Sequence, residues 1–180
     1  MHNSHRPAQD IGISTEPGLG VVKIQTYNAR DPGPRLAQAF KTPTPQPHRE
    51  ARNGGLGLAM VGPAEWIVTG PRTDVGSWLE MVTSAFAEEL VLAVDLSAGR
   101  TGLIFEGRAA ERLIGLCPMD LSPSTFLINC VARTRISDVA IMVIRLDNVR
   151  LRVIVDQSYT AQLLGVIQHG HASPRSQGAR

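Results

Sequence analysis

Apolar residues along this chain occur mainly as short runs or in strict alternation with polar residues, and this pattern predicts a protein rich in β-strands. Runs of this kind are typical of strands buried on one or both faces. They occur at residues 21–27, 56–61, 66–68, 91–96, 101–106, 128–134, 139–146 and 149–155. We expect a strand at each position, with turns at the intervening Gly, Pro, Asn and Asp residues.

Helical periodicity appears between some of these strands. Asp74 is a good N-cap residue, and the apolar spacing after it predicts a helix that runs to about Leu90. A compact helix is expected to end at Leu116, because Pro118 disfavours the helical conformation of the residue before it and has no N–H to donate. Ser158 can cap a last helix, whose apolar side is Leu163, Leu164 and Ile167.

The order strand, helix, strand occurs in both halves of the sequence and predicts the fold class. We expect an α+β protein with mostly antiparallel sheets, helices packed on one face and two similar βαβ-type halves. Asp147 and Asn148 tolerate positive φ and predict a two-residue hairpin turn. In the strand that follows, Arg150 and Arg152 alternate with apolar residues, which predicts a solvated basic outer face.

One compact domain is predicted over residues 20–168, with a Pro-rich arm at 31–53. Residues 1–19 and 169–180 contain few large apolar groups and are expected to be flexible tails. In the arm, prolines at 32, 34, 43, 45 and 47 argue against a regular element beyond one helical turn at 35–40. The arm is either a solvated connection or a segment that lies on a partner, because Pro-rich segments lose little entropy on binding.

The composition limits the possible functions. The chain of 180 residues is 43% hydrophobic and 19% charged, against about 25% charged in a typical soluble domain, which suggests that some surface is covered by partners. A net charge of +2 with scattered basic residues gives little support for nucleic-acid binding. We expect no membrane helix, because no run approaches the roughly 18 apolar residues required. Two distant cysteines and no apolar signal core favour the cytoplasm.

No residue pattern marks a catalytic, cofactor-binding or metal site. Glycine-rich nucleotide fingerprints are missing from the sequence. Cys117 has no His near it in sequence, so a small buried hydrophobic role is favoured over a nucleophile. Trp66 is interpreted as a core anchor in preference to a ligand platform. Isolated His pairs are too few for a four-ligand metal site; these are His2 with His5 and His169 with His171.

Three motifs in register carry a resemblance to a known family. The first is Asp95–Arg100 followed by a strand, Gly107–Ile114 and Cys117–Leu121. Upstream, Leu58–Val68 contains a strand, a Gly-Pro-x-Glu-Trp turn and another strand, and downstream Asp156–Tyr159 opens the last helix. Over residues 56–168 the chain resembles the gamma subunit of heterotetrameric sarcosine oxidase, a family similar to part of the aminomethyltransferase fold.

The resemblance implies a non-catalytic subunit of an oxidoreductase complex. It implies larger alpha and beta flavoprotein subunits and a small delta subunit as partners, with neither nucleic acid nor membrane involved. Those larger subunits would oxidatively demethylate sarcosine or a similar N-methyl amino acid, and would carry FAD, FMN, NAD and tetrahydrofolate. This chain would carry no cofactor and would supply surface and rigidity.

Other functions stay open at this point. A small folate-binding aminomethyltransferase-like protein would need Asp95 or Asp120 as an acid–base or orienting group, although either could simply bond its own turn. The chain could also be the small subunit of a related N-methyl amino acid dehydrogenase, or a stand-alone binding module. Titration with tetrahydrofolate separates the folate-binding alternative from the others.

Overall fold

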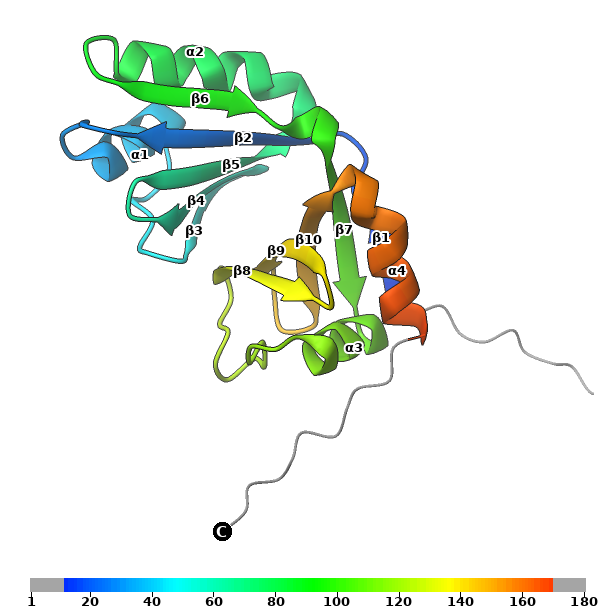
Figure 1. Cartoon of the computed structure of the whole chain (residues 1–180). Coiled ribbons are helices and arrows are strands. Elements are labelled where there is room, and N and C mark those ends of the chain that lie inside the picture. Colours follow the sequence, from blue (N-terminus) through cyan, green and yellow to red (C-terminus); the bar gives the residue numbers. More distant parts are fainter. Residues whose placement is uncertain (1–11, 170–180) are drawn as a thin grey trace, which may run out of the picture.

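The computed structural model describes residues 12–169 as two five-stranded antiparallel sheets with α-helices on their outer faces (Figure 1). The first sheet has the order β3-β4-β5-β2-β6, with β2 at Leu19–Thr26, β3 at Glu50–Asn53, β4 at Leu56–Gly62, β5 at Glu65–Pro71 and β6 at Val91–Asp95. The second has the order β1-β7-β10-β9-β8, with β1 at Gly12–Thr15, β7 at Arg100–Glu106, β8 at Val131–Ile136, β9 at Val139–Arg145 and β10 at Arg150–Asp156.

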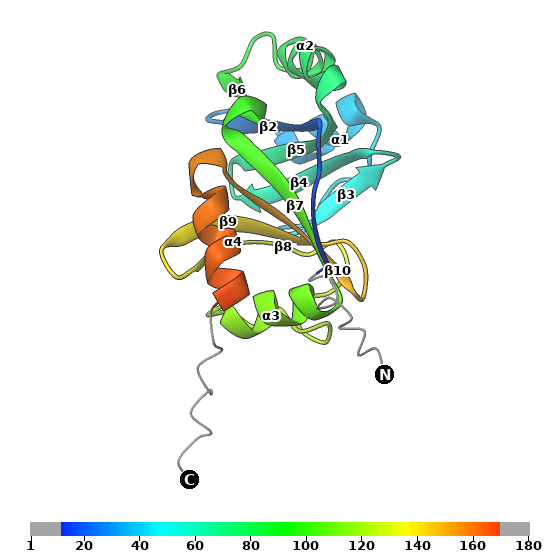
Figure 2. The same cartoon turned by 90° about the vertical axis from the view of Figure 1, so that its right-hand side faces the viewer.

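Two helices cover each sheet. Helices α1 (Pro32–Phe40) and α2 (Val75–Ala85) pack on the first sheet, and α3 (Arg108–Leu116) and α4 (Thr160–His169) on the second. In Figures 1 and 2, α2 and α3 lie at opposite ends of the molecule. The predicted α+β class with antiparallel sheets is confirmed. Among residues 12–169, no helix has the length and apolar character needed to cross a membrane.

Apolar side chains form three core layers, because successive strand residues point to opposite faces. On β10, for example, Val153 packs under α3 and α4, whereas its neighbour Ile154 points between the sheets. The layer between the sheets contains Leu19, Val21, Ala59, Val61, Ile67, Val131, Met142, Ile144 and Ile154. Burial of one such side chain stabilises the fold by about 1.5–3 kcal/mol. That the two halves form a single domain over residues 20–168 stays a prediction.

The N-terminal tail prediction was wrong for residues 12–19. Gly12–Thr15 form β1, which pairs antiparallel with β7, and Leu19 begins β2. Ile13 packs against the core of the second sheet. A Cβ at Gly12 would lie 2.8 Å from the carbonyl oxygen of Glu106, so glycine permits the close pairing. Residues 1–11, and residues 170–180 of the predicted C-terminal tail, lie outside the described part of the chain, while His169 belongs to α4.

The irregular arm predicted over residues 31–53 was wrong where α1 and β3 form, although residues 42–46 between them are irregular. Pro32 and Pro34 stand in the first turn of α1, where backbone N–H groups have no intrahelical partner, so proline costs the helix little there. Leu36 and Phe40 are buried in the core of the first sheet. The arm ends in strand β3, and a bridge between Arg49 and Cys130, the residue before β8, fixes its last part.

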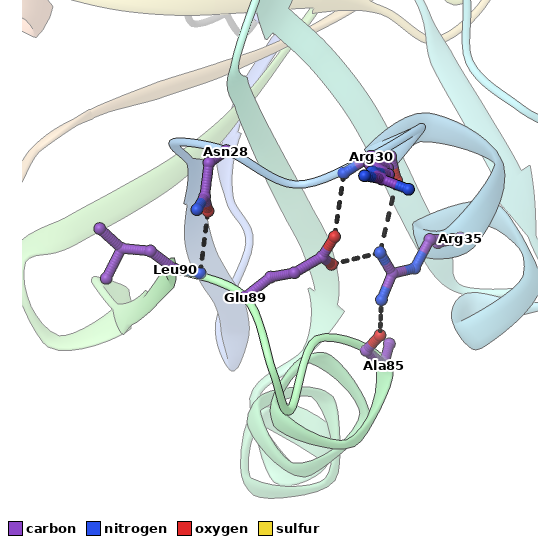
Figure 3. Close-up of polar contacts among 6 residues, drawn as sticks. All are labelled: Asn28, Arg30, Arg35, Ala85, Glu89 and Leu90. Atoms are coloured by element: carbon purple, nitrogen blue, oxygen red, sulfur yellow. Dashed lines mark hydrogen bonds and ion pairs between the residues drawn. The ribbon is translucent and has the colours of Figure 1, made fainter.

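Polar contacts tie α1 to the end of α2 (Figure 3). The Arg35 guanidinium binds the Glu89 carboxylate and the Ala85 carbonyl oxygen, and lies 4.3 Å from the centre of the Phe86 ring. Glu89 also accepts a hydrogen bond of 3.0 Å from the backbone N–H of Arg30. Thus the first part of the Pro-rich segment is bound to the chain's own first half.

Several element ends differ from their predicted positions. Helix α2 stops at Ala85, and the Asp74 side chain makes no capping bond to it. At the start of the last helix, Asp156 accepts hydrogen bonds from the N–H and hydroxyl of Ser158, so Asp156 fills the role expected of Ser158. The end of α3 at Leu116 is confirmed.

The connections around β8 and β9 also differ from prediction. Strand β8 begins at Val131 and not at residue 128, because Asn129 has a φ of 65° and interrupts the extended backbone. Strand β9 ends at Arg145 and β10 begins at Arg150, which leaves four residues in a turn predicted to have two. The Asp147 carboxylate accepts from the backbone N–H groups of Val149 and Arg150 within that turn.

Candidate functional site

Two groups of polar, mainly charged side chains lie between the sheets, on either side of the apolar layer. Strand β5 contributes Thr69 to one group and Glu65 to the other. Strand β10 contributes Arg152 to the first and Asp156 to the second. One group is buried, and the other lines an open groove.

Arg152 is the centre of the buried group. It donates two hydrogen bonds, of 2.8 and 2.6 Å, to the carboxylate of Glu16, and its Nη1 lies 3.9 Å from Oε1 of Glu50. The Glu50 side chain is fully buried; it accepts from the Thr69 hydroxyl at 3.1 Å and lies 3.3 Å from Nη1 of Arg52. This cluster, which we call the buried cluster, joins both sheets through charge.

The buried cluster depends on a glycine and on the central place of β10. Glu50 extends across Gly57, where a Cβ would lie 2.0 Å from the Glu50 Oε1 atom. Strand β10 has neighbours on both edges and packed layers on both faces. The predicted basic outer face was therefore wrong for Arg152, which is buried, although Arg150 is exposed as expected.

The groove on the other side of the apolar layer has a volume of about 320 Å³. Glu65 accepts hydrogen bonds of 2.8 and 2.6 Å from Arg133 and lies 3.0 Å from Nζ of Lys23. Arg100 and Asp156 form a second pair at 3.0 Å. Apolar side chains complete the lining, among them Val21, Ile67, Leu96, Ile141, Met142 and Ile154.

Hydrogen bonds and ion pairs lower the pKa values of both carboxylates in this groove. Hydrogen bonds from Arg133, opposed by partial burial and helped by Lys23, lower the pKa of Glu65 to about 2. Hydrogen bonds from Ser158, and more weakly the charge of Arg100, lower the pKa of Asp156. Both carboxylates are therefore ionised at neutral pH and held by cations, an arrangement suited to rigidity more than to proton transfer.

Arg145 organises the loop between α3 and β8, which contains the Cys117–Leu121 motif. Its guanidinium is buried and donates to the backbone carbonyl oxygens of Leu121, Phe126, Asp147 and Asn148. Burial lowers the pKa of Arg145. Sequence reasoning missed this residue, because an arginine at the end of a strand carries no local sign that its donors will bind a distant loop.

The cysteine and histidine candidates are separated. Cys117 is buried, with its sulfur 3.4 Å from the Thr134 hydroxyl, and Cys130 is half-buried; both thiols are free. His48 lines an apolar recess together with Cys130, a neighbourhood that sequence reasoning missed. Within residues 12–169, no group of His, Cys, Asp and Glu could hold a metal. Of the paired histidines, His169 has its Nδ1 3.0 Å from the Gly165 carbonyl oxygen, which accepts from it when Nδ1 is protonated, and the remaining three, His2, His5 and His171, lie outside the described residues.

The other residues singled out in the sequence lie apart from one another. Asp95 ends β6 and binds the N–H and hydroxyl of Ser97, which lowers its pKa. Asp120 lies in the loop after α3, where it accepts from the Ser122 N–H at 2.9 Å and the Thr125 hydroxyl at 3.0 Å. Trp66 is buried in the core, as predicted. Each aspartate thus stabilises a turn in a different half of the fold.

Comparison of folds defines the class of protein. The structure is similar to the glycine cleavage system aminomethyltransferase T from Bartonella henselae, with a TM-score of 0.61 and 11% identity over 88% of this chain and 45% of that one. It is more similar to a chain of the heterotetrameric sarcosine oxidase from Corynebacterium sp. U-96, with a TM-score of 0.76 and 21% identity over 91% of this chain and 87% of that one. The fold is aminomethyltransferase-like.

Sequence comparison narrows the class to a family. No family model matches the chain. The sarcosine oxidase subunit gamma of Corynebacterium sp. (strain U-96) is 26% identical over 155 residues, covering 84% of this chain and 72% of the relative. The corresponding subunit of Arthrobacter sp. is 30% identical over 142 residues, covering 76% and 66%. The chain is similar to sarcosine oxidase gamma subunits, and the resemblance carried by its motifs is confirmed.

Proposed function

We propose that this chain is a non-catalytic gamma-type subunit of a heterotetrameric sarcosine oxidase. The observation that carries the proposal is its similarity to two gamma subunits over 84% and 76% of its own length. In this role the larger alpha and beta subunits carry FAD, FMN, NAD and tetrahydrofolate, and a small delta subunit is the remaining partner. They perform the oxidative demethylation of sarcosine in the cytoplasm, and this chain supplies a rigid body on which they assemble.

The groove geometry supports a scaffold role. The charged groups that line it are tied in the pairs Lys23–Glu65, Arg133–Glu65 and Arg100–Asp156. Asp95 and Asp120, the acid–base candidates of a folate-binding alternative, bond their own turns in separate halves of the fold. Shared fold is weak support for shared chemistry, and the likeness to aminomethyltransferase T spans less than half of that enzyme.

Reconstitution tests this function. The larger subunits are purified with and without this chain, and sarcosine-dependent oxygen consumption is measured for each. We expect activity in the assembled complex, and a complex without this chain that is less stable or fails to assemble. The isolated chain should be colourless and should not bind tetrahydrofolate in a titration. Stoichiometric flavin or folate bound to the chain alone would contradict the non-catalytic assignment.

A further inference from the structure

An apolar patch lies at the open edge of the first sheet. It consists of Tyr27, Leu90, Leu92 and Val94, which we call the β6 surface. Their exposed fractions are 62%, 64%, 50% and 36%. Large apolar side chains scattered singly on a protein surface need no explanation, but contiguous ones mark interaction sites.

Strand register places these side chains on one face. Val94 pairs with Lys23 and Leu92 pairs with Gln25, while the Tyr27 N–H donates to the Leu90 carbonyl oxygen at 3.2 Å. The alternate residues of the strand, Val91 and Ala93, point to the other face and pack against the core under α2. One face of β6 is therefore satisfied within the chain, and the other presents a row of apolar groups.

The backbone edge of β6 is also available. Within the described residues β6 pairs with β2 on one side, and it ends the sheet order on the other. Natural edge strands are usually protected by charges, proline, bulges or a covering segment. From Leu90 to Val94 the sequence has no charged residue and no proline. Such an edge is suited to accept one further strand through backbone hydrogen bonds.

Two possible occupants fit this surface poorly. Residues 1–11 and 170–180 contain Met1 and Ile11 as their only large apolar residues, so they cannot supply apolar groups at alternate positions. A second copy could pair with β6 as an antiparallel strand, with Leu92 of one copy opposite Leu92 of the other. Asp95 of each copy would then lie opposite Glu89 of the other copy. Hydrogen bonds from Ser97 and from the Arg30 backbone hold the pKa values of these two carboxyls below their usual range, so both are charged. Like charges directly opposite each other destabilise a strand pair.

We propose that the β6 surface binds an extended segment of a larger subunit, which adds to the first sheet as a strand beside β6. The segment carries large apolar side chains at alternate positions, which cover Leu90, Leu92 and Val94. At its end beside Asp95 the segment carries a basic side chain, because Asp95 is exposed at the end of β6 and favours a cation there. This inference rests on the proposed function, since it names the surface through which the gamma subunit joins its complex.

Binding to the purified larger subunits tests the surface. The double variant Leu92→Lys/Val94→Lys places two charges in the row, and Val149→Lys is the matched control, since Val149 is 58% exposed in the β9–β10 turn of the other sheet. We expect the double variant to raise the Kd by at least about tenfold, as for loss of a central interface contact. The control should bind as the wild type does. Both should keep the wild-type thermal unfolding midpoint within a few degrees, as expected of surface substitutions.

Hydrogen exchange gives a second measurement. Amides of residues 90–95 that point away from β2 should exchange more slowly in the complex than in the isolated wild-type chain. Wild-type binding by the double variant, or unchanged exchange at these residues in the complex, would overturn the assignment of the β6 surface and leave the proposed function intact. Failure of the wild-type chain to bind the larger subunits would instead overturn the proposed function. A wild-type homodimer that the double variant converts to monomer would identify a second copy as the occupant and refute the proposal.

Discussion

The two charged groups between the sheets use the same chemistry in different surroundings. In the buried cluster, Arg152 is almost fully enclosed between Glu16 and Glu50. In the groove, Arg133 and Lys23 are half exposed to water around Glu65. Removal of one partner from a buried ion cluster leaves an uncompensated charge, whereas a solvated pair contributes little. The number of ion pairs therefore does not measure how much they contribute to the stability of the fold.

The largest effect should follow substitution of Arg152. We expect Arg152→Met to reduce the free energy of unfolding by about 3–5 kcal/mol, because it leaves Glu16 without its ion-pair partner and takes a cation from the buried Glu50. Urea unfolding followed by circular dichroism measures this. Arg150→Met on the same strand is the control and should change stability by less than about 1 kcal/mol, because Arg150 is exposed. Equal losses in both variants would contradict the distinction between buried and solvated charge.

A smaller effect is expected where Glu50 crosses its neighbouring strand. Gly57→Ala should destabilise the fold by about 1–3 kcal/mol, because the added methyl group collides with the buried carboxylate and forces it from its place. Gly55→Ala is the control, because a Cβ added at Gly55 would lie 3.7 Å from its nearest neighbour, the Cδ atom of Pro71. Thermal unfolding of both variants reports the difference. A Gly57→Ala protein as stable as wild type would mean that the Glu50 carboxylate can move freely.

The smallest effect is expected in the groove, and it should depend on pH. Because the pKa of Glu65 is lowered from 4.5 to about 2 in the folded chain, its ionised form stabilises the fold above pH 4.5. That contribution is lost as pH falls from 4.5 towards 2. We expect Glu65→Gln to cost at most about 1 kcal/mol at pH 7, since Arg133 and Lys23 are partly solvated. The difference from wild type should shrink over that acid range.

Urea unfolding of the wild type and Glu65→Gln across pH 2–7 measures this linkage. Glu80→Gln on the exposed side of α2 is the control for removal of a surface carboxylate. A stability difference at Glu65 that is constant from pH 7 to 2 would show that its partners do not favour the ionised form.

The regular elements could be predicted because their apolar spacing is local. Strands at β4, β5, β7, β9 and β10 and helices α2 and α3 follow from alternation, periodicity and the stop at Pro118. Helix α1 was missed because its prolines were taken as helix breakers wherever they stand. Prolines in the first turn are compatible with a helix, and this helix then buries Leu36 and Phe40. That apolar pair four residues apart was the signal available.

The charged groups could not be predicted, because they depend on distant partners. Arg152 alternates with apolar residues in the way a solvated arginine does. It is buried because it lies between the two sheets, where Glu16 binds it. Arg145 likewise binds carbonyl oxygens of a loop some twenty residues earlier. Sequence separation hides such contacts, whereas the turn bonds of Asp95 and Asp120 span two residues and were anticipated.

Strand β1 has a consequence for the order in which the chain folds during synthesis. Its partner strand begins at Arg100, and Glu16 binds an arginine that follows it by 136 residues. The ribosome therefore releases β1 long before either partner exists, and closing loops of this length slows folding. Strand β1 can therefore pair only after β7 has emerged, and the bond between Glu16 and Arg152 forms only after β10 has emerged.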